Sequence, residues 1–330
     1  MLEISTKLKE NLIKANQELK QKYSAKSNLD KQSLRVKIKT ELGGIIKLDQ
    51  MSEDKLESWT DNRAIVGVDG SINKLGSNYP HYLYLLQALA KSTAKEDITA
   101  TELFCPLVSN SKEEINNFIF EQYQQGNNSI SKQHAANKIK ISKLAELELE
   151  VAIQAVKEWQ PKLIMLDGSL IRYRIEAEEK WKELREVAIS QEVLLVGVIE
   201  EIGTQEVGER IDEELAGFYD RELLFGVLDL GEMLTLEFKR GLKTAFLRPS
   251  RDPQVIGLDI LEEQHSEFQN MAKLVYTLTP EDSRGIPIWL DVVDNEVRIS
   301  DQMMKSLIDT YLDSDLKKRL FASKRDERIY

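Results

Sequence analysis

The spacing of apolar positions divides the middle of the chain into strands and helices. Short apolar runs predict strands, and apolar residues that recur every three or four positions predict helices. From residue 60 onward the pattern predicts three strands, two helices, a strand, a helix and a strand, over 64–69, 82–90, 100–108, 111–124, 131–159, 162–167, 173–191 and 193–198. Three consecutive strands without an intervening helix indicate an antiparallel meander.

With the helices over 111–124 and 131–159 counted as one helical connection, this order is β-β-β-α-β-α-β, that of the ribonuclease H-like fold. We therefore expect an α/β protein whose core is a mixed five-stranded sheet with flanking helices. Residues 1–60 contain few helix breakers apart from Gly43-Gly44 and predict a helical N-terminal extension. Residues 61–330 would hold the core and its C-terminal additions: a charged helix with Arg210 and Glu213, short strands near 235–247, a helix near 259–273, a strand over 288–292 and a final helix over about 301–321.

Two of the predicted strands end in the same tripeptide. The first leads into Asp69-Gly70-Ser71 and the fourth into Asp167-Gly168-Ser169. A carboxylate where a buried strand ends lies where α/β folds keep their sites. Asp-Gly also forms two-residue hairpin turns, but neither copy is followed by an obvious return strand. In the ribonuclease H-like fold the first and fourth strands are neighbours, so the two aspartates would lie close together.

The composition is that of a globular protein, with 42% hydrophobic and 31% charged residues among 330. No segment resembles a signal peptide or reaches membrane-spanning length, so we expect a cytoplasmic protein that does not contact membranes. The net charge of −11 argues against attraction of the whole surface to nucleic acid, but a local basic groove remains compatible with it. Basic residues gather at both ends, including Lys324–Arg328, and such runs are usually solvated.

Sulfur and imidazole ligands are scarce. Cys105 is the only cysteine, and His81, His134 and His265 are scattered along the chain. A cysteine-based zinc site within one chain is therefore excluded. Any metal ion would have to be bound by oxygen.

A third carboxylate is predicted on the helix over 131–159. Its apolar face runs through Leu144, Ala145, Val151 and Ala152, and Glu148 falls in the middle of that face. A glutamate among apolar residues is costly unless its charge is compensated, and a bound metal ion would compensate it. The alternative is a glutamate at the edge of the stripe that pairs with Lys143. Glu146 and Glu150 lie on a more polar side and are expected to be solvated.

With these residues the chain resembles the NurA-domain nucleases over about 60–300. The resemblance is carried by Val68–Ser71, the helix segment Leu144–Ala152, Leu166–Leu170, the segment Asp220–Leu224 with Gly231-Glu232, and a late strand that ends in Val297–Ile299. It implies a ribonuclease H-like core and a Mn²⁺-dependent DNA nuclease with 5′ to 3′ exonuclease and single-strand endonuclease activity. It also implies a homodimer that works with a HerA-type hexameric ATPase in double-strand break end resection and DNA repair.

The family's functional residues carry over onto three positions. Asp69 and Asp167 match its two metal-binding aspartates, and Glu148 matches its helical glutamate, with Glu150 as the alternative. Two departures stand out. Family members have a C-terminal Tyr-Pro and a downstream Ala-His on the last helix, which are absent after Arg298, so a fourth catalytic residue is not identified. Where a basic residue is expected after the strand over 193–198, the chain has Glu200-Glu201.

The expected chemistry is two-metal phosphodiester hydrolysis. Asp69 would bridge two Mn²⁺ or Mg²⁺ ions, and Asp167 and Glu148 would complete their shells; one ion would activate the attacking water and the other would stabilise the leaving oxygen. Ser71 and Ser169 could orient ligands, although turn or helix-cap roles are the commoner function of such residues. One alternative is a non-catalytic ribonuclease H-like scaffold that binds a motor ATPase or DNA. Another is an actin-like ATPase, which would need a second glycine-rich loop for adenosine.

Overall fold

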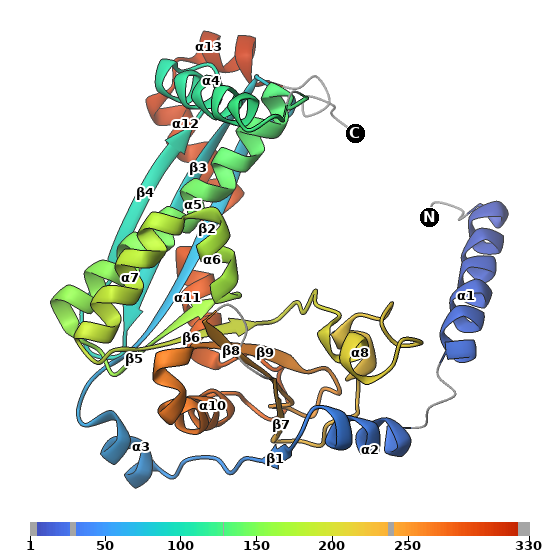
Figure 1. The fold of residues 1–330 in the computed structure, drawn as a ribbon. Coiled ribbons are helices and arrows are strands. Elements are labelled where there is room, and N and C mark those ends of the chain that lie inside the picture. The colour runs from blue at the N-terminus through green and yellow to red at the C-terminus, as the bar shows by residue number, and fades with distance from the viewer. Residues whose placement is uncertain (1–4, 27–30, 128, 237–240, 323–330) are drawn as a thin grey trace.

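A mixed β-sheet forms the centre of the molecule. The computed structural model describes residues 5–26, 31–127, 129–236 and 241–322, and within these residues the sheet has nine strands in the order β1-β7-β8-β9-β6-β5-β2-β3-β4 (Figure 1). The strands are β1 (Ile45–Lys47), β2 (Ile65–Gly76), β3 (Tyr82–Ser92), β4 (Ile98–Phe104), β5 (Leu163–Asp167), β6 (Leu194–Ile199), β7 (Glu232–Thr235), β8 (Leu242–Leu247) and β9 (Ile256–Leu261).

Five of these strands form the predicted core. In β4-β3-β2-β5-β6 the meander strands pair antiparallel, whereas β2 pairs parallel with β5 and β5 parallel with β6. The ribonuclease H-like arrangement is therefore confirmed. Strands β9, β8, β7 and β1 continue the sheet beyond β6 with antiparallel pairing, which makes the sheet wider than the predicted five strands.

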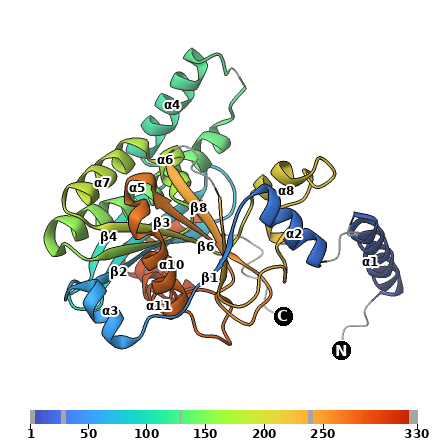
Figure 2. The same ribbon diagram turned by 60° about the horizontal axis from the view of Figure 1, so that its bottom comes forward.

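Helices cover both faces of the sheet (Figures 1 and 2). On one face, α5 packs with α7 over a core that includes Val66, Val68 and Ile164. On the other, α10 and α11 pack over Ile65, Leu163 and Met165. The helices are α1 (Thr6–Lys26), α2 (Lys31–Glu41), α3 (Glu53–Thr60), α4 (Ser109–Gln124), α5 (Lys132–Trp159), α6 (Leu170–Glu176), α7 (Glu178–Ser190), α8 (Glu206–Ile211), α9 (Asp220–Leu223), α10 (Phe268–Thr277), α11 (Ile288–Val297), α12 (Asp301–Tyr311) and α13 (Ser314–Leu320), with a 3₁₀ helix over Glu262–Glu267.

The N-terminal extension contains α1, α2 and α3, and also the unpredicted strand β1. β1 pairs with β7 and so forms one edge of the sheet. Helix α2 packs beside α8. The boundary between residues 60 and 61 falls in the loop between α3 and β2 and remains a prediction. The basic segment Lys324–Arg328 lies outside the described residues.

The prediction of a strand over 288–292 is wrong, because these residues begin helix α11. A short apolar run has the same appearance in a buried strand and a buried helix. Here Leu290, Val293 and Val297 recur at helical spacing and are buried. The late segment that ends in Val297–Ile299 is therefore a helix end and not a strand.

Three other predicted boundaries also differ. The helix near 259–273 begins as strand β9, and α10 starts only at Phe268. The helix over 173–191 is two helices that meet at Ala177. The final helix is divided at Leu312 and Asp313, because the Asp313 carboxylate accepts hydrogen bonds from the first amides of α13 and caps it.

Candidate functional site

Asp69 and Asp167 lie side by side. Strands β2 and β5 are parallel neighbours and pair Val68 with Leu166, so the next residue on each strand is an aspartate. Neither Asp-Gly step is a hairpin turn. β2 continues through Gly70 to Gly76 in register with β3, while β5 ends at Asp167 and Gly168, with φ +104°, directs the chain toward α6. The first and fourth core strands thus bring the two carboxylates together, as predicted.

Glu148 reaches this place from helix α5. Its side chain is only 2% exposed, and a Cβ at Gly70 would clash with Glu148 Oε1 and would stand 2.8 Å from Leu144 Cδ1. The glycine after Asp69 is thus needed for the close approach of α5, and not for a turn. Glu146 and Glu150 on the same helix are exposed, as expected.

The charge of Glu148 is compensated by Arg172. This arginine stands on α6, just after the Asp167 loop, and its Nη2 donates to Glu148 Oε2. Lys143 instead pairs with Glu102 and Glu114, with N–O distances of 2.5 and 2.9 Å. The predicted alternative, a glutamate at the edge of the stripe paired with Lys143, is therefore not what the structure shows.

Burial and neighbouring negative charges raise the proton affinity of each of the three acids. Burial first, and then the negative charges of Asp167 and Glu148, raise the pKa of Asp69 to about 7. Burial also raises the pKa of Glu148 to about 7, against the opposing effect of Arg172. The pKa of Asp167 is raised by burial and then by Glu200. Perturbed carboxyls in one place are typical of functional sites.

A fourth carboxylate, Asp294, completes this group from the other face of the sheet. Side chains alternate along a strand, so Val68 and Gly70 face α5 while Gly67 and Asp69 face α11. A Cβ at Gly67 would stand 2.8 Å from Val293 Cγ2, so α11 lies very close to β2. Asp294, the next residue, contributes negative charge that raises the pKa of both Asp69 and Asp167.

Sequence reasoning missed Asp294 because it assigned 288–292 to a strand. The signal that could have identified it is the i, i+3, i+7 spacing of Leu290, Val293 and Val297, which predicts a helix whose exposed side carries Asp291 and Asp294. Asp294 pairs with Arg298 at 3.2 Å, one turn along α11.

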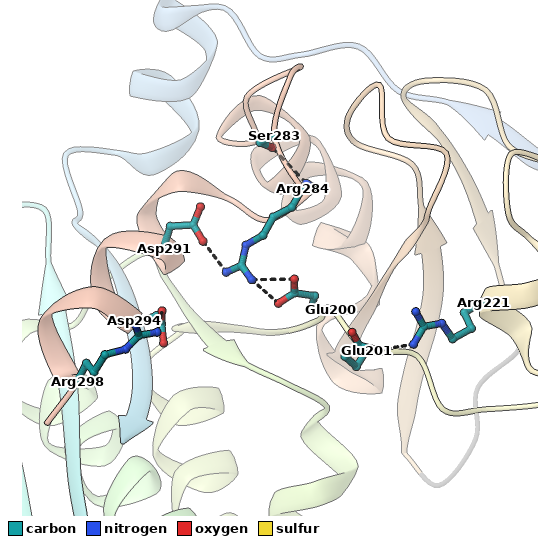
Figure 3. Close-up of polar contacts among 9 residues, drawn as sticks. Glu200, Glu201, Arg221, Ser283, Arg284, Asp291, Asp294 and Arg298 are labelled. Atoms are coloured by element: carbon teal, nitrogen blue, oxygen red, sulfur yellow. Dashed lines mark hydrogen bonds and ion pairs between the residues drawn. The ribbon is translucent and has the colours of Figure 1, made fainter. Parts of the chain in front are cut away.

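Basic residues from distant segments balance the two glutamates after β6 (Figure 3). Arg284 donates to both carboxylate oxygens of Glu200, at 2.7 and 2.8 Å, and to Asp291 at 2.7 Å. Arg221 pairs with Glu201. Arg284 thus reaches the segment after β6 from the loop before α11, where it is paired with carboxylates.

The loop that follows Asp167 is held by hydrogen bonds. Ser169 caps α6, since its Oγ accepts from the amide of Ile171. The same Oγ donates to Asp259 at 2.5 Å, and Asp259 also accepts from the amide of Leu170 and from Thr244. Ser71 Oγ accepts from the amide of Ile299 at 3.2 Å. Both serines therefore accept structural hydrogen bonds, Ser169 within its own loop and Ser71 from a residue 228 positions away.

The donor set suits a hard divalent cation, because Asp69, Glu148, Asp167 and Asp294 offer only carboxylate oxygens. As they stand, however, no three Asp, Glu, His or Cys side chains among the described residues are grouped closely enough to hold a metal ion. Glu148 is engaged by Arg172 and would be free to bind a metal ion only after it releases that arginine. No helix in the described part of the chain is long and apolar enough to cross a membrane.

Comparison with known proteins gives a family match and several structural likenesses. The family model for the NurA domain matches residues 63–299. The fold is similar to that of the NurA nuclease from Sulfolobus solfataricus, with a TM-score of 0.57 and 13% identity over 96% of this chain and 98% of that chain. At this identity the likeness shows the fold alone.

Weaker likenesses join the chain to two Endonuclease V structures. The catalytic domain of the human enzyme has a TM-score of 0.39 and 13% identity over 85% of this chain and 95% of that chain. The Ciona intestinalis enzyme in complex with an inosine-containing DNA has a TM-score of 0.34 and 16% identity, over 87% and 99%. No curated protein sequence matches the chain.

Proposed function

The chain belongs to the NurA domain family, and on this premise we propose that it is a DNA nuclease that hydrolyses phosphodiester bonds with two divalent ions, Mn²⁺ or Mg²⁺. One observation carries the proposal. The adjacent, parallel strands β2 and β5 present Asp69 and Asp167 at consecutive register positions, and the buried Glu148 stands over the glycine that follows Asp69.

The catalytic and metal-binding residues of the proposal are Asp69, Glu148 and Asp167, with Asp294 as the fourth carboxylate. Asp69 lies between the other acids, since β5 adjoins it on one side and α5 and α11 approach it from the two faces of the sheet. The chemistry that two divalent ions supply in such a site is activation of the attacking water and stabilisation of the leaving oxygen.

Arg172 has a second role in this proposal. It favours the ionised form of the buried Glu148 while no other cation is near, because an unpaired buried carboxylate is strongly disfavoured. If Glu148 held a metal ion, the guanidinium of Arg172 would be available to a phosphate oxygen, which it could bind through two parallel hydrogen bonds.

The finer activity rests on the family resemblance. We propose 5′ to 3′ exonuclease and single-strand endonuclease activity in DNA end resection and repair, with a HerA-type hexameric ATPase as partner and a homodimer as the working form. The Sulfolobus protein with the same fold is itself described as a nuclease.

Paired glutamate variants on α5 test the site. The Glu148→Gln variant should lose at least about a thousandfold in Mn²⁺-dependent digestion of single-stranded DNA, since loss of a metal ligand removes several kcal/mol of transition-state stabilisation. The Glu150→Gln variant, with an exposed side chain on the same helix, should keep wild-type activity. Full activity in Glu148→Gln, or in Asp69→Ala, in a clean preparation would contradict the assignment.

The Glu148–Arg172 ion pair favours one second candidate, the non-catalytic scaffold that binds DNA or a motor ATPase. It satisfies Glu148 without a metal ion. A manganese titration separates the two functions, because a scaffold binds DNA at every Mn²⁺ concentration and never shortens it.

A further inference from the structure

Two lysines meet on the arm of the molecule formed by β2, β3 and α5, which extends away from the wider part of the sheet (Figure 1). Lys74 lies near the end of β2 and is paired in register with Tyr84 on β3. Lys140 lies on α5, and its Nζ stands 4.9 Å from the centre of the Tyr84 ring. Lys74 Nζ is 5.7 Å from the same ring and 5.1 Å from the ring of Tyr82.

These lysines differ from the other basic groups near the site. Arg172, Arg284 and Lys143 each pair with one or two carboxylates. In the part of the chain that the structure describes, neither Lys74 nor Lys140 forms an ion pair. Lys74 donates only to the carbonyl oxygen of Ser77, at 2.8 Å. The tyrosine rings orient the ammonium groups without neutralising them, so two positive charges are held together without a counter-charge.

Holding like charges together is unfavourable, and here burial adds to the cost. Lys140 is partly buried, and its pKa is lowered by this burial and by the charge of Lys74. In a protein with a net charge of −11, a paired and uncompensated positive group is a place where an anion would relieve the repulsion.

The distance of the lysine pair from Glu148 follows from the geometry of β2 and α5. Along β2, Lys74 is four residues beyond Gly70, or about 13 Å at 3.3 Å per residue. Along α5, Lys140 is eight residues before Glu148, or about 12 Å at 1.5 Å per residue. Since Glu148 stands over Gly70, the two elements run in opposite directions side by side. The lysine pair therefore lies about 12–13 Å from Glu148 along the α5 face of the sheet.

We propose that Lys74 and Lys140 bind a backbone phosphate of the DNA strand, about 12–13 Å from Glu148. The inference rests on the proposed function for the identity of the anion as DNA. The pair would hold the strand along the arm without reading its sequence, because phosphate contacts position a nucleic acid and do not specify bases.

Binding measured without turnover tests the pair. A labelled 20-nucleotide single strand is titrated with the full chain in EDTA at several NaCl concentrations. Loss of this one phosphate contact predicts that the slope of log Kobs against log[NaCl] becomes less negative by about 0.7 in the Lys74→Gln/Lys140→Gln variant. At 50 mM salt its affinity should fall several-fold. An unchanged slope overturns the proposal.

Two control variants make the result specific. Lys157→Gln removes a lysine on the same helix that pairs with Glu183 at 2.8 Å, and it should bind like the wild type. Lys74→Arg/Lys140→Arg keeps both charges and should restore the slope. The glutamine variant should unfold at the wild-type temperature or above it, because it removes a repulsion. The proposal is overturned if the glutamine variant melts at a lower temperature than the wild type and the arginine variant fails to restore the slope. The two lysines would then have a merely structural role.

Hydrolysis of a small ester separates this inference from the proposed function. Bis(p-nitrophenyl) phosphate cannot span the distance from the acids to the lysines. The double glutamine variant should therefore hydrolyse it at the wild-type rate in Mn²⁺ while its KM for long DNA rises. Asp69→Ala should lose both activities if the nuclease assignment holds. Wild-type KM for long DNA in the glutamine variant overturns the lysine site and leaves the nuclease assignment intact.

Discussion

Asp69 and Asp259 are both buried aspartates on strands of one sheet, yet their surroundings are opposite. Asp259, 3% exposed, accepts hydrogen bonds from Ser169, Leu170 and Thr244. Among the described residues, the Asp69 carboxylate, 8% exposed, accepts a hydrogen bond only from the amide of Gly70, and it stands near other carboxylates. Both side chains are removed from water, but Asp259 has three donors and Asp69 has one.

The difference appears in what shifts the pKa of each carboxyl. Burial raises the pKa of both carboxyls. At Asp259 hydrogen bonds from Ser169 and Thr244 oppose this effect, whereas at Asp69 the charge of Asp167 adds to it. Burial alone therefore does not mark a functional acid. A buried acid without compensating donors or cations does mark such a site, because its charge is unfavourable unless a bound ligand compensates it.

The largest effect on stability is expected at the satisfied acid. Asp259→Ala leaves two hydroxyl groups and one amide without their acceptor, and should lower the free energy of unfolding by about 2–4 kcal/mol. Urea unfolding followed by circular dichroism measures this. A loss below about 0.5 kcal/mol would mean that the hydrogen bonds of Asp259 do not stabilise the fold, and the contrast with Asp69 would disappear.

A smaller effect is expected at the glycine between Asp69 and Glu148. Gly70→Ala would force Glu148 and Leu144 away, at a cost of about 1–3 kcal/mol in unfolding free energy. Nuclease activity should fall with it, because Glu148 is displaced from Asp69. Gly203→Ala is the matched control, since nothing lies within 4 Å of its Cβ position. Equal stability of the two variants would show that α5 does not approach β2 so closely.

The smallest effect on stability is expected at Asp69, where a substitution should stabilise the protein and the gain should depend on pH. Because the pKa of Asp69 is raised from 3.8 to about 7, the folded protein holds a proton that the unfolded chain releases at lower pH. Stability from this group is therefore present below about pH 4 and is lost as the pH rises through about 7.

Asp69→Asn should remove that loss. The variant should be more stable than the wild type by about 1 kcal/mol at pH 8 and nearly equal to it at pH 4, since the neighbouring acids share the proton and moderate the effect. Thermal unfolding across this pH range measures the difference. A variant less stable than the wild type at pH 8 would place Asp69 in the same class as Asp259.

Local patterns were sufficient for the core and for the placement of Asp69, Glu148 and Asp167, whose catalytic role stays a prediction. The aliphatic runs before Asp69 and Asp167 give buried strands, and the order of elements makes these strands neighbours, as observed. Helical spacing placed Glu148 on the apolar face of α5, and it is buried there. These signals are strong because each depends on periodicity within a single element.

Partners contributed by other elements were not predictable in this way. Asp294 was missed because a short apolar run does not distinguish a helix from a strand. The pairing of Glu148 with Arg172, and of Glu200 with Arg284, joins residues 24 and 84 positions apart. The sequence alone determined which strands carry acids and which face of a helix is buried. Only the tertiary structure decided which charges are compensated, because the energy of a charge depends on its distance from others in space and not along the chain.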